Sequence, residues 1–130
     1  MKTAYKLLTI AFLVFVTTSC VQEEHTKTIT FSIDMNGVAN ANNVGIRGDF
    51  TNKRWQETIP MSDEDGDGIY SVTLSQKTAV YGIEFKFVNQ GENFELKGQN
   101  NREIVFEYKP EIIEYTAKFD STEGVKINRK

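Results

Sequence analysis

The chain has 130 residues, which is room for one domain rather than two. It carries 18 acidic and 15 basic side chains, a formal net charge of −3 at pH 7. A chain without a basic surplus gives no reason to expect nucleic acid as a partner, and a single cysteine excludes an intrachain disulfide framework.

The first twenty residues have the order of an export signal. Lys2 and Lys6 precede an apolar run from Leu7 to Val16 that is too short to span a bilayer as a helix. Small residues then lead to Cys20. This order resembles a bacterial lipoprotein signal, in which the cysteine becomes the lipidated first residue of the mature chain; an ordinary secretory signal is the alternative. We expect residues 1–19 to be cleaved, and about 110 residues then suffice for a two-layer β domain.

Residues 20–27 are polar and without periodicity, which predicts a tether between the lipidated Cys20 and the domain. The stretch 22–24, Gln-Glu-Glu, resembles the acidic export signals that carry some bacterial lipoproteins to the cell surface. We therefore expect a lipid-anchored protein of the cell envelope, at the outer membrane, that touches the membrane only through its anchor. The two alternatives at that membrane are the periplasmic side and display at the cell surface. His25 lies in this tether, where no fixed partners would support metal or catalytic chemistry.

Period-two alternation of apolar and polar residues predicts strands in the rest of the chain, with turn-forming clusters between them. The predicted strands are Thr28–Met35, Val44–Phe50, Ile69–Ser75, Ile83–Val88, Glu103–Tyr108 and Ile112–Phe119. No helical periodicity follows the signal. The pattern predicts an all-β fold, an immunoglobulin-like antiparallel β-sandwich of about seven to eight strands over residues 28–120, followed by a polar tail over 121–130.

Two aromatic residues do not fit the strand pattern. Six aromatics occupy inward positions and are predicted to be core: Phe31, Phe85, Phe87, Phe106, Tyr115 and Phe119. Trp55 and Phe94 instead lie in polar loops. Flat rings in loops suit the apolar faces of sugars, whose hydroxyls need donors and acceptors such as those near residues 99–102. The alternative is that both rings fold back as lids over the sandwich.

An acidic stretch matches the first half of an EF-hand calcium loop, with Asp63, Asp65 and Asp67 at the first, third and fifth positions. The position that should hold the bidentate glutamate is Leu74, so the loop cannot close in the EF-hand manner. An acidic turn of a hairpin is the preferred interpretation, and a weak calcium site remains open. We expect no cofactor and no other metal.

Catalytic chemistry is not expected. The chain offers no histidine in a pattern typical of a buried position that could act as a base, its cysteine belongs to the signal, and its serines have no partner that would activate them. Paired carboxylates could hydrolyse a glycoside, but this needs a deep cleft that a small sandwich seldom forms. The sequence therefore predicts a non-catalytic protein.

An ordered set of short motifs covers most of the domain, residues 28–108: V-G-I-R-G-D-F, a tryptophan, T-I-P-M, D-G-D-G-I-Y, E-F-K-F-V, F-E-L and N-N-R. In this order they resemble the starch- and glycogen-binding modules of carbohydrate-binding families 20 and 48. The resemblance implies that an α-glucan lies across two aromatic rings, here Trp55 and Phe94, the latter in place of a second tryptophan. It also implies that Lys86 and either Asn100 or Asn101 bind sugar hydroxyls.

These observations predict a non-catalytic, α-glucan-binding lipoprotein of the bacterial cell envelope, with a starch- or glycogen-like polysaccharide or oligosaccharide as its ligand. Envelope proteins that process glycans are candidate partners. The alternative is a protein-interaction domain that kept the sandwich and lost the sugar site.

Overall fold

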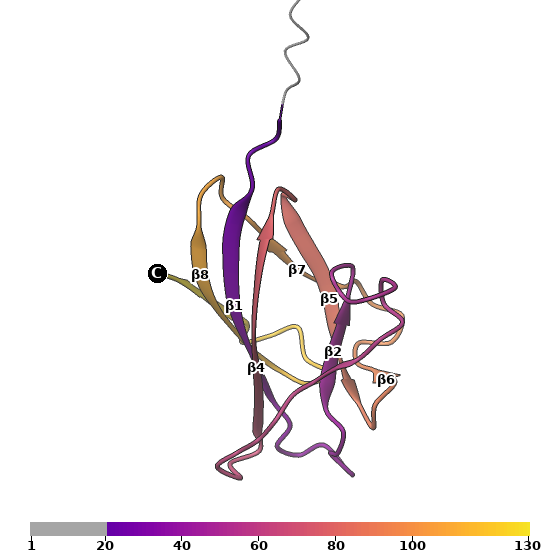
Figure 1. The fold of residues 1–130 in the computed structure, drawn as a ribbon. Coiled ribbons are helices and arrows are strands. Elements are labelled where there is room, and N and C mark those ends of the chain that lie inside the picture. The colour runs from indigo at the N-terminus through magenta and orange to yellow at the C-terminus, as the bar shows by residue number, and fades with distance from the viewer. Residues whose placement is uncertain (1–20) are drawn as a thin grey trace, which may run out of the picture.

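A computed structural model describes residues 21–130, and the predicted signal and Cys20 lie outside the described residues. The described chain forms nine strands and no helix, in two sheets that face each other (Figure 1). The strands are β1 (His25–Asp34), β2 (Gly45–Gly48), β3 (Ile59–Pro60), β4 (Ile69–Thr78), β5 (Gly82–Asn89), β6 (Asn93–Phe94), β7 (Arg102–Val105), β8 (Glu111–Lys118) and β9 (Lys126–Arg129). The predicted all-β sandwich is confirmed.

The first sheet has the strand order β4-β1-β8-β9. β1 pairs with β4 in antiparallel fashion and with β8 in parallel, so one pair departs from the expected antiparallel arrangement. On the outer face, hydroxyl groups of β1 and β4 meet across the strands, as in the 2.8 Å contact between Thr30 and Thr73. Polar residues on this face and apolar residues on the other produce the alternation seen in the sequence.

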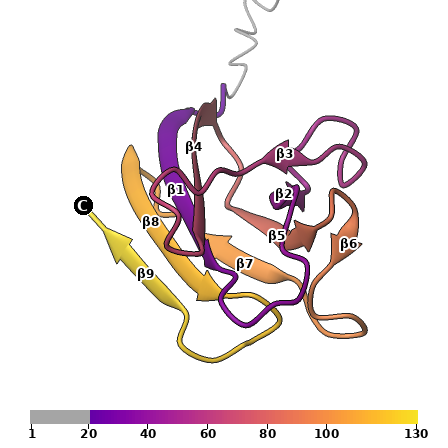
Figure 2. The same cartoon turned by 90° about the horizontal axis from the view of Figure 1, so that it is seen from below.

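The second sheet has the order β3-β2-β5. β5 also pairs with β6 near its C-terminal end and with β7 near its N-terminal end. Figure 2 shows the two sheets as separate layers, with β2, β5, β6 and β7 facing β1, β4 and β8. On the outer face of this sheet, Arg47 of β2 lies directly opposite Lys86 of β5. This pair borders the candidate site described below.

The core lies between the layers and is rich in aromatic rings. Phe85 is at its centre, with ring centroids 5.0 Å from Phe31, 5.0 Å from Tyr115 and 5.7 Å from Phe87. These four side chains are buried, and Phe106 and Phe119 pack against them while partly buried. The six aromatics predicted from alternation to be core are therefore confirmed as core.

Both ends of the domain extend further than the sequence predicted. His25 to Lys27 belong to β1 and not to the tether, and Lys27 is buried because it faces inward beside Glu111. Because an inward lysine breaks the apolar pattern, the sequence did not predict this end of the strand. The predicted polar tail contains β9, whose exposed residues pair with β8 although they carry no clear alternation.

The acidic stretch does not close a hairpin within one sheet. β3 belongs to the second sheet and β4 to the first, so residues 61–68 carry the chain from one layer to the other. A single antiparallel bridge, between Ser62 and Ser71, is all that joins the two arms. The hairpin prediction was wrong because turn-forming residues mark a change of direction but not the sheet that follows it.

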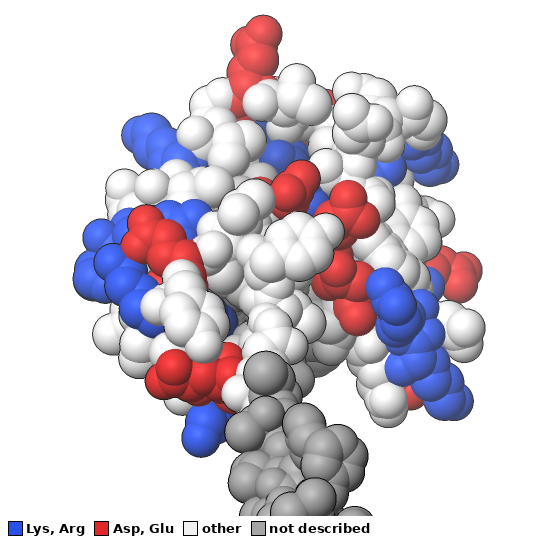
Figure 3. Space-filling model, turned by 90° about the horizontal axis from the view of Figure 1, so that it is seen from above, with Lys and Arg blue, Asp and Glu red and all other residues white. Residues whose placement is uncertain are grey.

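Residues 21–130 contain no helix of the length and apolarity that a membrane crossing requires. The end of the sandwich seen in Figure 3 carries both acidic and basic side chains, and neither sign forms a continuous field. This end therefore offers no extended positive surface to a polyanion.

Candidate functional site: an aromatic pair on the second sheet

Trp55 and Phe94 lie side by side. Their ring centroids are 6.3 Å apart and the ring planes are inclined by 52°. Trp55 comes from the connection between β2 and β3, and Phe94 from β6, where it pairs with the fully buried Val88 of β5. Both rings are half-buried. We call these two residues the aromatic pair. The sequence separated them, and the second sheet brings them together.

Arg47 ties the aromatic pair to the sheet. Its guanidinium carbon is 5.5 Å from the centre of the Phe94 ring, within the range of a cation–π contact. Nε donates a hydrogen bond of 2.7 Å to the hydroxyl of Thr58, which in turn donates one of 2.6 Å to the carbonyl oxygen of Gly91. Nη1 approaches the carbonyl oxygen of Trp55 at 3.4 Å. Sequence reasoning missed Arg47, although its outward position in the second predicted strand was a signal for it.

The loop that carries Trp55 has an unusual backbone. Lys53, Arg54 and Trp55 have φ angles of 53°, 40° and 69°, so three successive residues adopt the left-handed conformation that side chains disfavour. The Trp55 amide donates to the carbonyl oxygen of Gly48 at 2.9 Å and to the hydroxyl of the buried Thr51 at 3.2 Å. These bonds hold the loop folded back so that the indole ring reaches Phe94.

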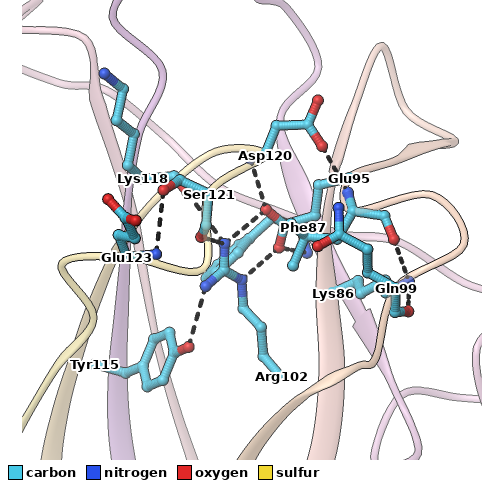
Figure 4. Close-up of polar contacts among 11 residues, drawn as sticks. Lys86, Phe87, Glu95, Gln99, Arg102, Tyr115, Lys118, Asp120, Ser121 and Glu123 are labelled. Carbon is cyan, nitrogen blue, oxygen red and sulfur yellow. Dashed lines mark hydrogen bonds and ion pairs between the residues drawn. The ribbon is translucent and has the colours of Figure 1, made fainter.

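Lys86 differs from the sequence expectation. It stands on the outer face of β5 as predicted, but its side chain is only 9% exposed. Nζ donates hydrogen bonds of 2.9 Å to the carbonyl oxygens of Leu96 and Gln99. Figure 4 shows Lys86 beside Gln99. The expectation of a lysine that faces the sugar is therefore wrong in its geometry, because the connection 95–101 covers the ammonium group. Lys86 holds this connection in place.

A buried ion pair holds the same connection from the other side. Arg102 contacts Glu95 through two parallel hydrogen bonds, Nε to Oε1 at 2.6 Å and Nη2 to Oε2 at 2.8 Å (Figure 4). Glu95 also accepts from the amides of Phe87 and Asp120 at 3.0 Å each. Burial, the largest single effect, would lower the pKa of Arg102, but the hydrogen bonds and the Coulombic attraction to Glu95, together with Tyr115, outweigh burial and raise that pKa. The same burial raises the pKa of Tyr115, against the opposing effect of Arg102.

Asn100 and Asn101 are exposed at the end of this connection. They border a hollow of about 470 Å³ whose other walls include Thr122 and Val125, from the connection between β8 and β9. Neither Trp55 nor Phe94 borders this hollow. The structure therefore joins the two predicted aromatics in one group and the two predicted asparagines in another, with the connection fastened by Lys86 between them.

The three acidic side chains of the turn gather with one oxygen each within 4.8 Å of the others. These carboxylates already accept hydrogen bonds from backbone amides of the turn. Asp63 accepts from the amides of Gly66 and Gly68 at 2.9 Å, and Asp67 accepts from the amide of Ile69 at 2.9 Å. Desolvation raises the pKa of Asp63, but the hydrogen bonds from the amides of Gly68, Gly66 and Asp67 and the one with Asp65 together outweigh it and lower that pKa overall.

The hard oxygen donors of this turn suit calcium in type. Leu74, at the position of the closing glutamate, packs partly buried against the core. A calcium site at Asp63, Asp65 and Asp67 remains a prediction of the sequence, and the structure accounts for the three carboxylates as caps of the turn.

No protein-family model matches the chain, and no curated protein matches it in sequence. The solved structures that are similar to it include two solution structures of modules of the β/α-amylase from Paenibacillus polymyxa. The module CBM25-2 is 16% identical, with 82% of this chain and 94% of that chain covered and a TM-score of 0.48. The module CBM25-1 is 15% identical, with 81% and 93% covered and a TM-score of 0.45. At this identity and TM-score the two likenesses assign neither ligand nor site to this chain.

Proposed function

We propose that this chain is a non-catalytic α-glucan-binding lipoprotein of the bacterial cell envelope. The observation that carries the proposal is the aromatic pair: Trp55, from the connection between β2 and β3, and Phe94, from β6, meet on the second sheet with their ring centroids 6.3 Å apart. Neighbouring aromatic faces beside hydrogen-bonding groups suit a chain of sugar rings, which are apolar on their faces and polar at their edges.

The proposal divides the work among the site residues differently from the sequence expectation. Trp55 and Phe94 stack on glucose rings, and Arg47 fixes the Phe94 ring from its place on β2. Asn100 and Asn101 supply donors and acceptors to sugar hydroxyls from their exposed loop. Lys86 acts as a positioning residue, because its two hydrogen bonds to Leu96 and Gln99 present that loop.

The proposed anchor is the lipidated Cys20, at the outer membrane. Residues 21–24 are exposed and precede β1, so they form the short polar link that such an anchor needs. A shallow site of two half-buried rings binds one short segment of glucan weakly. Many copies on one membrane would engage a polymer together and gain avidity, which suits a protein that works beside envelope proteins that process glycans.

Affinity electrophoresis of the purified protein in gels that contain amylopectin tests the proposal. We expect retardation relative to a gel without polysaccharide, and we expect Trp55→Ala to abolish it. Tyr81→Ala is the matched control, because Tyr81 is an exposed aromatic outside the proposed site, at 82% exposure, in the turn between β4 and β5. Unretarded migration of the unmodified protein would refute glucan binding.

One observation favours the second candidate, a protein-interaction domain without sugar binding. The ammonium group of Lys86 already donates to two carbonyl oxygens, and both aromatic rings are half-buried. The surface available to a sugar is therefore smaller than the sequence predicted, which was a free lysine beside two exposed rings. A photo-crosslinking residue at the exposed position 56, beside Trp55, distinguishes the two in whole cells. A discrete protein adduct, together with unretarded migration in amylopectin, would favour this candidate.

A further inference from the structure

Exposed apolar side chains gather at the end of the sandwich where β1 begins. Among residues 21–130, nine large hydrophobic side chains are exposed, and six of them lie at this end: Val21, Val80, Tyr81, Val105, Tyr108 and Ile112. We call these six residues the apolar rim. Figure 1 shows this end, with the turn between β4 and β5 and the connection between β7 and β8 beside the start of β1. Such a concentration of exposed apolar groups indicates a contact surface.

Two tyrosines dominate the apolar rim. Tyr81, in the turn between β4 and β5, is 82% exposed, and Tyr108, in the connection between β7 and β8, is 71% exposed. Tyr108 is held in place: its ring meets the ring of His25 edge-on, with centroids 4.7 Å apart, and its hydroxyl donates to Glu23 at 3.3 Å. A tyrosine has an apolar ring and a polar tip, which suits the boundary between lipid tails and water.

The link that precedes β1 lies against the same two turns. Gln22 donates from Nε2 to the carbonyl oxygen of Ala79 at 3.3 Å, and Glu23 accepts from Tyr108. Glu23 is three residues from Cys20, so acyl chains on Cys20 would begin within about 11 Å of the Glu23 backbone. A membrane that holds such an anchor therefore lies next to both turns.

The charges at this end restrict the kind of lipid surface that fits. Glu23 and Glu24 are exposed, and Lys109 forms an ion pair of 2.7 Å with Glu107, in which both side chains are exposed. Figure 3, which views this end, shows acidic and basic side chains interspersed. Attraction to anionic lipids requires a cluster of basic residues, so this end suits a zwitterionic surface instead.

We infer that the apolar rim lies against the zwitterionic surface of the membrane that holds the anchor, with Tyr81 and Tyr108 at the level of the lipid headgroups. The inference rests on the lipid anchor of the proposed function and adds a second membrane contact to the single one expected from the sequence. Phe94 pairs with Val88, six residues along β5 from Gly82 and thus about 20 Å from this end. The aromatic pair therefore stays clear of the membrane and open to a polymer.

Single-tryptophan proteins locate each end of the sandwich relative to the membrane. Trp55 is the only tryptophan of the chain, so Trp55→Phe gives a background for Tyr81→Trp, Tyr108→Trp or Ile69→Trp. Ile69 is the matched control, because it is exposed and pairs with Asp34 at the opposite end of β1. Each protein is expressed from the full chain in bacteria, purified from the membrane fraction and reconstituted into vesicles of brominated phosphatidylcholine.

We expect bromine to quench about half or more of the emission in Tyr81→Trp and Tyr108→Trp, because an interfacial tryptophan lies at the headgroup level. The emission of Ile69→Trp should match that in vesicles without bromine. Equal quenching in all three, or no quenching in protein that floats with the vesicles, would overturn the inference. Protein that does not float would refute the lipid anchor and this inference with it.

A charge in the apolar rim separates contact through the rim from mere closeness to the anchor. Adding Tyr108→Asp to Tyr81→Trp should lower the quenching toward that of Ile69→Trp, because a carboxylate resists transfer out of water. Adding Ile69→Asp should leave the quenching unchanged. Full quenching in the presence of Tyr108→Asp would count against the inference. Retardation in amylopectin should survive Tyr108→Asp, since Tyr108 is outside the aromatic pair, so failure here is distinguishable from failure of glucan binding.

Discussion

Two connections border the outer face of the second sheet, and different forces hold them. The connection 95–101, between β6 and β7, is fastened by buried charge: Lys86 donates to two of its carbonyl oxygens, and Arg102 binds Glu95 through two hydrogen bonds. The connection 49–58, between β2 and β3, is held by backbone turns, by Thr51 and by Arg47, and contains three successive left-handed residues.

The difference shows where the fold specifies a single conformation. Buried charges have strict geometric requirements, so a connection that satisfies them has few alternatives. The connection that carries Trp55 keeps local strain and mostly neutral hydrogen bonds, which gives it more freedom to adjust. A second buried lysine fastens a connection in the same way as Lys86: Lys27 donates to the carbonyl oxygens of Glu107 and Lys109, in the connection between β7 and β8.

The largest expected effect comes from breaking the buried pair. Glu95→Gln leaves Arg102 buried without its counter-charge, and we expect a loss of about 3–5 kcal/mol in the free energy of unfolding. Urea denaturation measures it. Glu92→Gln is the control, since Glu92 is exposed and should change stability by less than about 0.5 kcal/mol. Equal effects of the two variants would contradict the role assigned to buried charge.

Glu111 tests whether the same rule holds in the first sheet, and it adds a pH dependence. Desolvation raises the pKa of Glu111, but hydrogen bonds from Lys27, the Glu107 amide and Arg129 outweigh it and lower that pKa below the ordinary 4.5. Since the folded pKa is lowered, ionised Glu111 stabilises the fold above about pH 4.5, and this contribution is lost as the pH falls through the folded value.

We therefore expect Glu111→Gln to destabilise the protein at pH 7, by less than Glu95→Gln because the Arg129 side chain is 33% exposed. The gap in stability between wild type and variant should shrink below pH 4.5, with thermal melts at several pH values as the measurement. Glu114→Gln, whose partner Lys130 is 63% exposed, is the control. A gap that widened toward low pH would contradict the assignment.

Lys86→Met tests the fastening of the connection 95–101 directly. The variant keeps the length of the side chain and loses both hydrogen bonds, so we expect a loss of about 1–2 kcal/mol. Hydrogen exchange should quicken at the Gln99 amide, which donates to the Leu96 carbonyl oxygen at 3.0 Å. Lys97→Met, exposed in the same connection, should leave both unchanged. Unaltered exchange in Lys86→Met would show that the connection holds itself.

The smallest effect should be a gain. Lys53 has a φ of 53°, so Lys53→Gly relieves left-handed strain and should stabilise the fold by about 0.5–1 kcal/mol after the entropy of glycine is counted. Asn52→Gly, outside the left-handed stretch, should instead be neutral or destabilising. Chemical denaturation compares the two. A loss of stability in Lys53→Gly would indicate that the Lys53 side chain makes a contact of greater value than the strain.

The sequence predicted what depends on local periodicity. Ile29, Phe31 and Ile33 alternate with polar residues, and this was enough to place β1 and its inward face. It did not predict the burial of Lys86, because the carbonyl oxygens of Leu96 and Gln99 that cover it are backbone atoms without a sequence signature.

At the candidate site, too, some features were predicted from the sequence, and those that depend on contacts between distant segments were not. Trp55 and Phe94 were predicted to share a surface from a family resemblance, and they do lie together. Arg47 was missed because its contacts with Thr58 and the Phe94 ring depend on how two loops fold over the sheet. The separation of Asn100 and Asn101 from the aromatic pair likewise depends on the path of a whole connection.

The parallel pairing of β1 with β8 determines when β1 can gain both of its partner strands during synthesis. Lys27 and Glu111, which are register partners and an ion pair, are 84 residues apart in the chain. β1 is made early, but one of its two edges has no partner until β8 has been made, and contacts between such distant segments form slowly. Until then its N–H and C=O groups on that side are open to other strands. Among the strands of residues 21–130, the first to be synthesised is therefore among the last to be fully paired.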